Sequence, residues 1–177
     1  MRRTLSQSWL LSLLWLLLWV GSAQSDFCHK NLPPSNPDIV YIDHGDGTVT
    51  DTRTGLMWKQ CTEGLSGAGC ETGSAQTFMW GQALTEAKSS TFANYSDWRL
   101  PNIKELASLI EDCRGGPAIN TNKFPNTPSS RHWSGSPTTH SSSLAHNVDF
   151  LPGRWSFGDR RNLVSAVGHV RLVRDGQ

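Results

Sequence analysis

The stretch GDGTVTDTRTGLMW, residues 45–58, sets the pattern of the N-terminal half of the chain. Two turns interrupt it, one at Asp46-Gly47 and one over residues 52–55. Aspartate and glycine at such positions are typical of tight turns between antiparallel strands. With the apolar run just before it, the stretch predicts a three-stranded meander whose strands cover residues 39–42, 48–51 and 56–58.

Three aspartates beside these turns raise the question of a calcium site. Asp43, Asp46 and Asp51 lack the Asp-x-Asp-x-Asp-Gly spacing and the terminal glutamate of an EF-hand loop. Short carboxylate side chains commonly hydrogen-bond the backbone of their own turn. We therefore interpret all three as turn-forming residues.

Two helices are predicted in the middle of the chain. Residues 79–89 place apolar side chains at a 3.6-residue period. A second helix is predicted after Asn102, which can cap it together with Glu105, three residues further on. At the corner before this helix we expect two side chains to provide packing and a buried hydrogen bond, Trp98 and Arg99.

The C-terminal third combines a loop with short strands. Residues 115–130 are rich in Gly, Pro, Asn, Thr and Ser, which predicts a long surface loop. Three strand-like pieces follow, at residues 132–135, 146–150 and 170–173. The whole pattern predicts an α+β fold, loop-rich, with two helices packed on small antiparallel sheets.

Five short strings in fixed order point to a particular family. They are GDGTVTDTRTGLMW at 45–58, DWRLPNIKEL at 97–106, WSGSP at 133–137, NVDF at 147–150 and HVRLVR at 169–174. In wording and spacing they resemble the DUF1566 family, which is also named after the C-terminal domain of the Legionella collagen-like adhesin. The resemblance covers residues 38–174. It implies a C-type-lectin-like fold and a role in binding at the cell surface.

The first residues have the composition of a secretory signal peptide. Two arginines precede an apolar run at 9–20, which is shorter than the roughly 20 residues of a spanning helix. We expect cleavage to remove residues 1–25 and to leave an arm at 26–37 and one DUF1566 domain at 38–177. The protein is then exported, to the periplasm, the cell surface or the extracellular space.

Four cysteines, an even number, favour disulfides in an exported chain. Cys61 and Cys70 flank a Gly- and Ser-rich loop and form the natural local pair, which leaves Cys28 to pair with Cys113. Zinc binding is the alternative, but the chain has no Cys-x-x-Cys or His-x-x-His spacing. We predict no metal and no cofactor.

Residue usage changes sharply at residue 124. Residues 124–176 contain no Lys, Glu, Gln or Met, whereas residues 26–123 contain fifteen of them. Substitution at the adenines of asparagine codons would produce this restriction, because such codons never become Lys, Glu, Gln or Met. Some proteins that resemble this family are targets of diversity-generating retroelements, which alter adenines in this way. Programmed diversity is therefore one interpretation, and ordinary drift in an exposed face is the other.

Charge is divided at the same place. Residues 26–123 carry 8 Lys and Arg against 12 Asp and Glu, a formal −4, whereas residues 124–177 carry 6 against 3, a formal +3. A basic surface with aromatic groups suits sulfated or carboxylated polysaccharide, because arginine forms paired charge-assisted hydrogen bonds with such anions. Scattered, solvated charges are the alternative. Export and a net charge near zero argue against nucleic acid.

These observations predict a non-enzymatic, adhesin-like domain whose partner is an anionic polysaccharide or a host or cell-surface protein. The alternative is a hypervariable receptor for protein ligands. Formylglycine-generating enzymes have a similar fold, but they need a cysteine pair in the C-terminal half, and no cysteine follows Cys113. The sequence leaves the oligomeric state open. The predicted ligand surface contains Thr138, Thr139, His140, His146, Arg154, Trp155, Phe157, Arg160 and Arg161.

Overall fold

The computed structural model describes residues 28, 29, 31–138, 141, 144–151, 155, 156 and 166–176. The predicted signal peptide at 1–25 lies outside this part of the chain. Among the described residues, no helix has both the length and the apolar character needed to cross a membrane.

The first β-sheet contains the predicted meander and one strand from the C-terminus. Its order is β1 (Tyr41–Asp43), β2 (Thr48–Asp51), β3 (Leu56–Lys59) and β11 (Val173–Asp175), and all neighbours are antiparallel. The predicted turn before β2 is confirmed. Gly47 has a φ of +85°, a conformation that glycine adopts without strain. A Cβ on Gly47 would also lie 2.8 Å from the ring of Phe92, so the turn needs glycine for two reasons.

The first strand begins later than predicted. Residues Asp38–Val40 form a short 3-10 helix, η1, and strand pairing starts only at Tyr41. The backbone N of Val40 donates to the carbonyl oxygen of Pro37 at 3.1 Å, because the fixed φ of proline favours a turn at this position. Ile39 is therefore 88% exposed and adds nothing to the core. The expectation of a strand from residue 39 is wrong.

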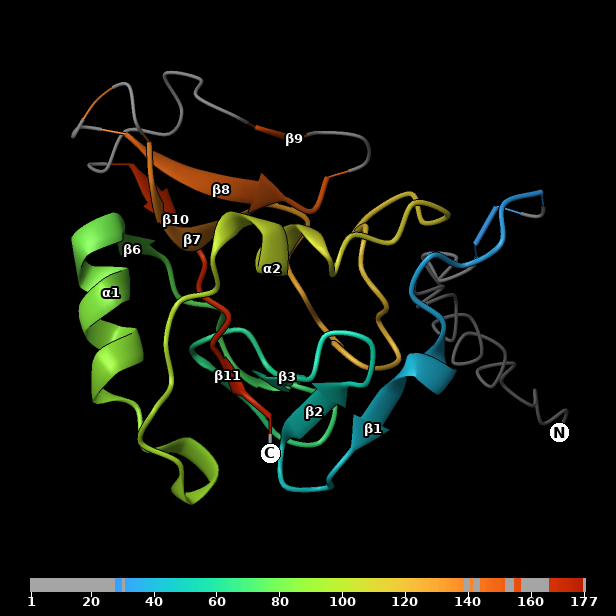
Figure 1. Ribbon diagram of the computed structural model, residues 1–177, viewed down its shortest axis with the longest axis horizontal. Helices are drawn as coiled ribbons and strands as arrows, with labels where there is room; N and C mark the ends of the chain where they lie inside the picture. Colours follow the sequence, from blue (N-terminus) through green and yellow to red (C-terminus); the bar gives the residue numbers. More distant parts are fainter. Residues whose placement is uncertain are drawn as a thin grey trace, which may run out of the picture.

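The second β-sheet is built from the C-terminal half of the chain. Its strands are β7 (Arg131–Pro137), β8 (Ala145–Asp149) and β9 (Trp155–Ser156), with β8 in the middle. Two of the predicted strands are therefore confirmed. Figure 1 shows the two larger sheets at opposite ends of the domain. Two smaller antiparallel pairs accompany them, β4 (Leu65–Ser66) with β5 (Thr72–Gly73) and β6 (Phe78–Met79) with β10 (Val167–Gly168).

Both helices lie where the sequence predicts them. In α2 (Ile103–Ala107), Oδ1 of Asn102 accepts hydrogen bonds from the backbone N of Lys104 and of Glu105, at 2.9 and 3.0 Å. The Glu105 carboxylate accepts one from the backbone N of Asn102 at 2.7 Å, which completes the capping box. Helix α1 (Trp80–Ser89) contacts β7, and α2 contacts β7 and β8. The α+β prediction is therefore confirmed.

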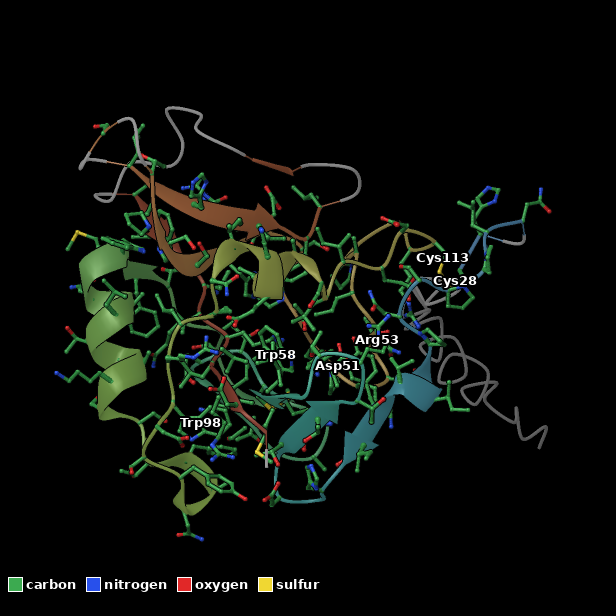
Figure 2. The ribbon with its side chains drawn as sticks, viewed as in Figure 1. Cys28, Asp51, Arg53, Trp58, Trp98 and Cys113 are labelled. Atoms are coloured by element: carbon green, nitrogen blue, oxygen red, sulfur yellow. A yellow bond between two sulfur atoms is a disulfide. The ribbon has the colours of Figure 1, made fainter. Side chains whose placement is uncertain are left out.

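The corner before α2 has the structural role predicted for it. Trp98 is 3% exposed, and its indole Nε1 donates to the carbonyl oxygen of Phe92, in the 3-10 helix η2 (Phe92–Asn94), at 2.9 Å. Figure 2 shows Trp98 on the side of the domain away from Cys28 and Cys113. Arg99 binds the Glu105 carboxylate at 2.7 Å, but its side chain is 39% exposed, so this hydrogen bond is only partly buried.

The C-terminal string HVRLVR joins the two halves of the domain. Val173 pairs with Trp58 in the first sheet and exchanges two backbone hydrogen bonds with Arg99, at 2.9 and 3.0 Å. Residues 170–172 are all buried, and they bond to the end of β3 and the chain that follows it. The expected strand at 170–173 is wrong except at its last residue, because the opposing chain leaves the register of β11 with β3: Leu172 bonds to Lys59, but Val170 bonds to Glu63.

Residues 115–130 do not form the predicted surface loop. Ile119 and Phe124 are fully buried in the core cluster that contains Trp58. The Asn120 amide donates to the carbonyl oxygen of Asn36 at 2.9 Å, so a polar residue of this segment is also enclosed. Composition favours a loop here, and the segment lacks regular structure, but the surrounding elements cover it.

One disulfide and a buried carboxylate fix the N-terminal arm. Glu111 is 1% exposed, and its carboxylate accepts hydrogen bonds from the backbone N and the hydroxyl of Ser35, at 2.7 and 2.9 Å, and from the backbone N of Asn36 at 2.9 Å. Figure 2 shows Cys28 and Cys113 together at this end of the domain. Both predicted disulfides are confirmed, Cys28–Cys113 and Cys61–Cys70.

Candidate functional site

The predicted ligand surface is described in three of its nine positions. Thr138 follows β7, and its hydroxyl donates to the carbonyl oxygen of Ser141 at 2.9 Å. His146 lies in β8 and is half-buried. The backbone of Trp155, in β9, pairs with Val148. His146 and Trp155 lie in the second sheet and Thr138 directly follows it, whereas the remaining six lie outside the described residues: Thr139, His140, Arg154, Phe157, Arg160 and Arg161.

Two arginines of the basic C-terminal segment are used inside the fold. Arg171 is completely buried, and Arg174 is 4% exposed. Arg174 donates from Nε to Oδ1 of Asp97 at 2.7 Å, and its guanidinium lies 3.9 Å from the ring centroid of Tyr95. Arg171 and Arg174 therefore add no charge to an exposed surface, and neither belongs to the predicted ligand surface.

Arg171 acts as the polar centre of the core. Burial lowers the pKa of its guanidinium to about 9, so the group remains charged at neutral pH. It also lies over the ring of Phe124, 4.9 Å from the centroid. Its nitrogens donate to four oxygens, the carbonyls of Lys59 and Gln60 and the hydroxyls of Thr62 and Thr127.

His132 is a second titratable group in the same core. Its Nδ1 lies 3.0 Å from the carbonyl oxygen of Ser130, which can only accept, so Nδ1 carries the proton. Burial, and then the nearby charge of Arg171, hold its pKa well below the usual value of 6.5. His132 is therefore neutral at pH 7. Because it is fully buried, it cannot contact a ligand at the surface.

A cavity of about 600 Å³ lies beside the first sheet. Its walls are the turn between β1 and β2, the end of β3, the loop closed by the Cys61–Cys70 disulfide, and the ring of Phe92. This volume is within the range of roughly 300–1,000 Å³ that is usual for small-molecule sites. Side chains with polar or aromatic groups line it, including Asp43, Asp46, Lys59, Gln60, Ser66 and Phe92.

The aspartates of the cavity shape its walls as turn residues. Oδ1 of Asp43 accepts from the backbone N of Gly45, and Oδ1 of Asp46 accepts from the backbone N of Thr48, each at 2.9 Å. Outside the cavity, Oδ1 of Asp51 likewise accepts from the backbone N of Arg53, at 2.9 Å. The interpretation of these three carboxylates as turn-forming residues is confirmed.

The cavity carries negative charge. The hydrogen bond from the Thr48 hydroxyl holds the pKa of Asp46 below its usual value, so this carboxylate stays ionised. Among the described residues, Lys59 is the one cation in the wall, and it is already neutralised, because its ammonium contacts both oxygens of Glu63, at 2.8 and 3.0 Å. The ammonium also lies 4.6 Å from the centroid of the Phe92 ring.

One group of side chains has the proximity needed for a metal, but its chemistry is different. Ligand atoms of Cys28, Glu111 and Cys113 lie within 4.8 Å of one another, and the described residues contain no other such group of three. The two cysteines form a disulfide, and metals bind the thiolate. Glu111 is engaged by the N-terminal arm. This group is therefore structural.

The cavity is not evident from the sequence. There Asp43 and Asp46 occur as separate turn residues, and nothing marks Lys59 or Gln60. The signal was present in the predicted meander, because β2 and β3 pair Thr48 with Lys59. That register brings the Asp46 turn beside the end of β3. The contributions of Phe92 and of the disulfide loop come from other parts of the chain.

Comparison with known proteins gives one finding. The family described as the Lcl C-terminal domain matches residues 47–174. No curated protein and no solved structure matches the chain.

Proposed function

Because the chain belongs to the Lcl C-terminal domain family, we propose that it is an exported, non-enzymatic domain that binds anionic, sulfated glycans. Membership of this family indicates a surface adhesin-like domain. The proposal adds the ligand class and assigns recognition to the basic, aromatic segment around β9. It needs no cofactor and no metal.

The sequence positions of three other arginines support this proposal. Arg171 and Arg174 are buried and paired with other residues, so the ligand must be held by other cations. Arg154, Arg160 and Arg161 are close in sequence to β9, the outer strand of the second sheet. The proposal assigns the contacts with sulfate groups to these three arginines, because a guanidinium binds such anions with two parallel hydrogen bonds.

Binding to immobilised heparin at low and at physiological salt tests the proposal. The variant Arg154→Ala/Arg160→Ala/Arg161→Ala is expected to lose at least about tenfold in affinity, since hydrogen bonds to charged groups contribute roughly 1.5–3 kcal/mol each. Affinity of the unmodified protein is expected to fall as salt rises, because exposed charges are screened.

A matched control removes three other positive charges. Lys88 and Lys104 are exposed and Lys123 is half-buried. All three lie outside the second sheet. The variant Lys88→Ala/Lys104→Ala/Lys123→Ala has the same net charge as the arginine variant and is expected to keep its heparin affinity. Equal losses in both variants would show non-specific attraction and refute the assignment.

A hypervariable receptor for protein ligands is the second candidate. The absence of Lys, Glu, Gln and Met from residues 124–176 favours it. Adenine substitution in asparagine codons does not produce tryptophan, so Trp133 and Trp155 must be fixed scaffold positions or come from other codons. Trp133 is fully buried and donates from Nε1 to the carbonyl oxygen of Phe78 at 2.8 Å, as a fixed scaffold residue should. Sequencing codons 124–177 in many cells of one clonal culture tests this candidate. Substitutions clustered at 138–161 would support it, and an invariant region would oppose it.

A further inference from the structure

We propose that the cavity beside the first sheet is a second ligand site, which binds a neutral sugar unit through its hydroxyl groups. This inference goes beyond the glycan-binding proposal, because it uses other residues and a ligand without negative charge. It rests on three features: a wall that is already ordered, an amide with no partner among the described residues, and a negative charge that disfavours anions.

The walls of the cavity are fixed before any ligand arrives. Asp43 and Asp46 each close a turn through a hydrogen bond from the backbone, at 2.9 Å. The opposite wall belongs to the loop that the Cys61–Cys70 disulfide closes. A site that is ordered in advance loses little conformational entropy when it binds, so even a small ligand can be held.

Gln60 provides an amide without a partner. The residue is 6% exposed and lines the cavity. Its backbone N donates to Gly47 and its carbonyl accepts from Arg171, but its side-chain amide makes no hydrogen bond with any residue that the structure describes. A hydroxyl group can satisfy both ends of an amide, since it donates and accepts.

Charge decides which class of ligand the cavity accepts. Oδ2 of Asp43 and Oδ2 of Asp46 accept no hydrogen bond from the described residues, so both remain available. These oxygens are acceptors for sugar hydroxyls and repel sulfate or carboxylate groups. Lys59 does not reverse this charge, because Glu63 neutralises it. The ring of Phe92 adds an apolar surface of the kind that the C–H face of a sugar contacts.

The cavity is separate from the surface proposed for sulfated glycans. In Figure 1 the turn between β1 and β2 lies at the bottom of the domain, and β8 and β9 lie at the top. A change in one site is therefore expected to leave the other unaffected. One domain could hold a neutral unit and a sulfated unit of the same or of different polysaccharides.

Titration followed by NMR tests the inference on the protein with both disulfides intact. The probes are the methyl glycosides of glucose, galactose and mannose, with glucuronate and ethanolamine as charged comparisons. At least one neutral glycoside is expected to shift the side-chain amide signals of Gln60 and the backbone amides of Gly45 and Gly47, with an affinity in the range of about 1–10 mM. Glucuronate is expected to bind at least about tenfold more weakly, because it places a carboxylate beside Asp43 and Asp46.

The variant Asp43→Asn gives the second readout. Asparagine keeps the oxygen that accepts from Gly45, so the turn is preserved while the charge is lost. It is expected to weaken glycoside binding and to reduce the preference over glucuronate. Asp112→Asn, an exposed aspartate elsewhere, is the matched control and is expected to change neither.

Three results would overturn the inference. They are the absence of shifts at these amides with every neutral glycoside up to about 100 mM, equal binding of glucuronate, and shifts caused by ethanolamine alone. Heparin binding is measured on the same samples. Because the proposed heparin site uses other residues, Asp43→Asn is expected to keep its heparin affinity. The two proposals can therefore fail independently of each other.

Discussion

Arg174 and Asp97 join the end of the chain to the corner before α2, with Nε of Arg174 2.7 Å from Oδ1 of Asp97. Val173, next to Arg174, pairs with both Trp58 and Arg99. Three of the five strings that resemble the family, around residues 45–58, 97–106 and 169–174, therefore meet in one place. Their shared role is to hold the two sheets together.

Arg174→Ala is expected to lower the free energy of unfolding by about 2 kcal/mol, because it removes a charge-assisted hydrogen bond and the packing of the guanidinium on Tyr95. Asp97→Asn is expected to have a smaller effect, since the Asp97 side chain is 58% exposed and asparagine can still accept the hydrogen bond. Urea denaturation measures both. If both variants lost the same unfolding free energy, the buried Arg174 side chain would not contribute more than Asp97, contrary to this prediction.

Arg171→Lys is expected to cost about 3 kcal/mol of unfolding free energy. Lysine keeps the charge but cannot reach four oxygens with its single nitrogen, so buried acceptors remain unsatisfied. Arg53→Lys is the control at a side chain that is 40% exposed, where less than about 1 kcal/mol is expected. Thermal and chemical denaturation should rank the two variants in this order.

Stability is expected to fall as the pH is lowered from 7 to about 5. Burial first, and the charge of Arg171 second, depress the pKa of His132 in the folded state. Below the unfolded value of 6.5, the unfolded chain takes up a proton that the folded chain resists, so acid favours unfolding. The slope from His132 is at most about 1.4 kcal/mol per pH unit. His169, whose pKa burial also lowers, adds a change of the same sign.

His132→Asn separates this contribution from others. The lowered pKa values of Asp38, Asp46 and Asp97 act only below their usual value of 3.8, so they do not affect this pH range. The stability of the variant, measured by denaturation between pH 7 and 5, is expected to depend less on pH than that of the unmodified protein. Parallel curves would show that the buried imidazole does not cause the acid sensitivity.

Glu111→Gln is expected to loosen the N-terminal arm and to cost about 1–3 kcal/mol, because one end of the new amide would face hydrogen-bond donors of Ser35 and Asn36. Limited proteolysis near residue 35 and the free energy of unfolding report the change. Glu86→Gln in α1 is the control and is expected to be neutral. The Cys28–Cys113 disulfide should remain in both variants, which keeps the arm attached while its hydrogen bonds are tested.

Local chemistry was sufficient for the turns, the caps and the Cys61–Cys70 disulfide, and the even number of cysteines then left Cys28 to pair with Cys113. Asp46, Asn102 and Glu105 bond to atoms within three residues of themselves, so their roles can be predicted from spacing alone. The strings that resemble the family gave its membership correctly. For the predicted ligand surface, the structure describes only Thr138, His146 and the backbone of Trp155, and the binding role of all nine residues stays a prediction.

Burial of polar residues and the cavity depended on contacts between distant segments. In the sequence, Arg171 stands between the apolar residues Val170 and Leu172, a pattern typical of an exposed residue in a strand. Its hydrogen-bond partners, however, lie 44 to 112 residues away, and it is completely buried. Ile119 and Phe124 occur in a polar, turn-rich segment, but the first sheet supplies the apolar surface that buries them. Gln60 and Phe92 reach one cavity only after the chain has folded. Composition and periodicity describe a residue and its neighbours in sequence, whereas burial is set by whatever else packs against it.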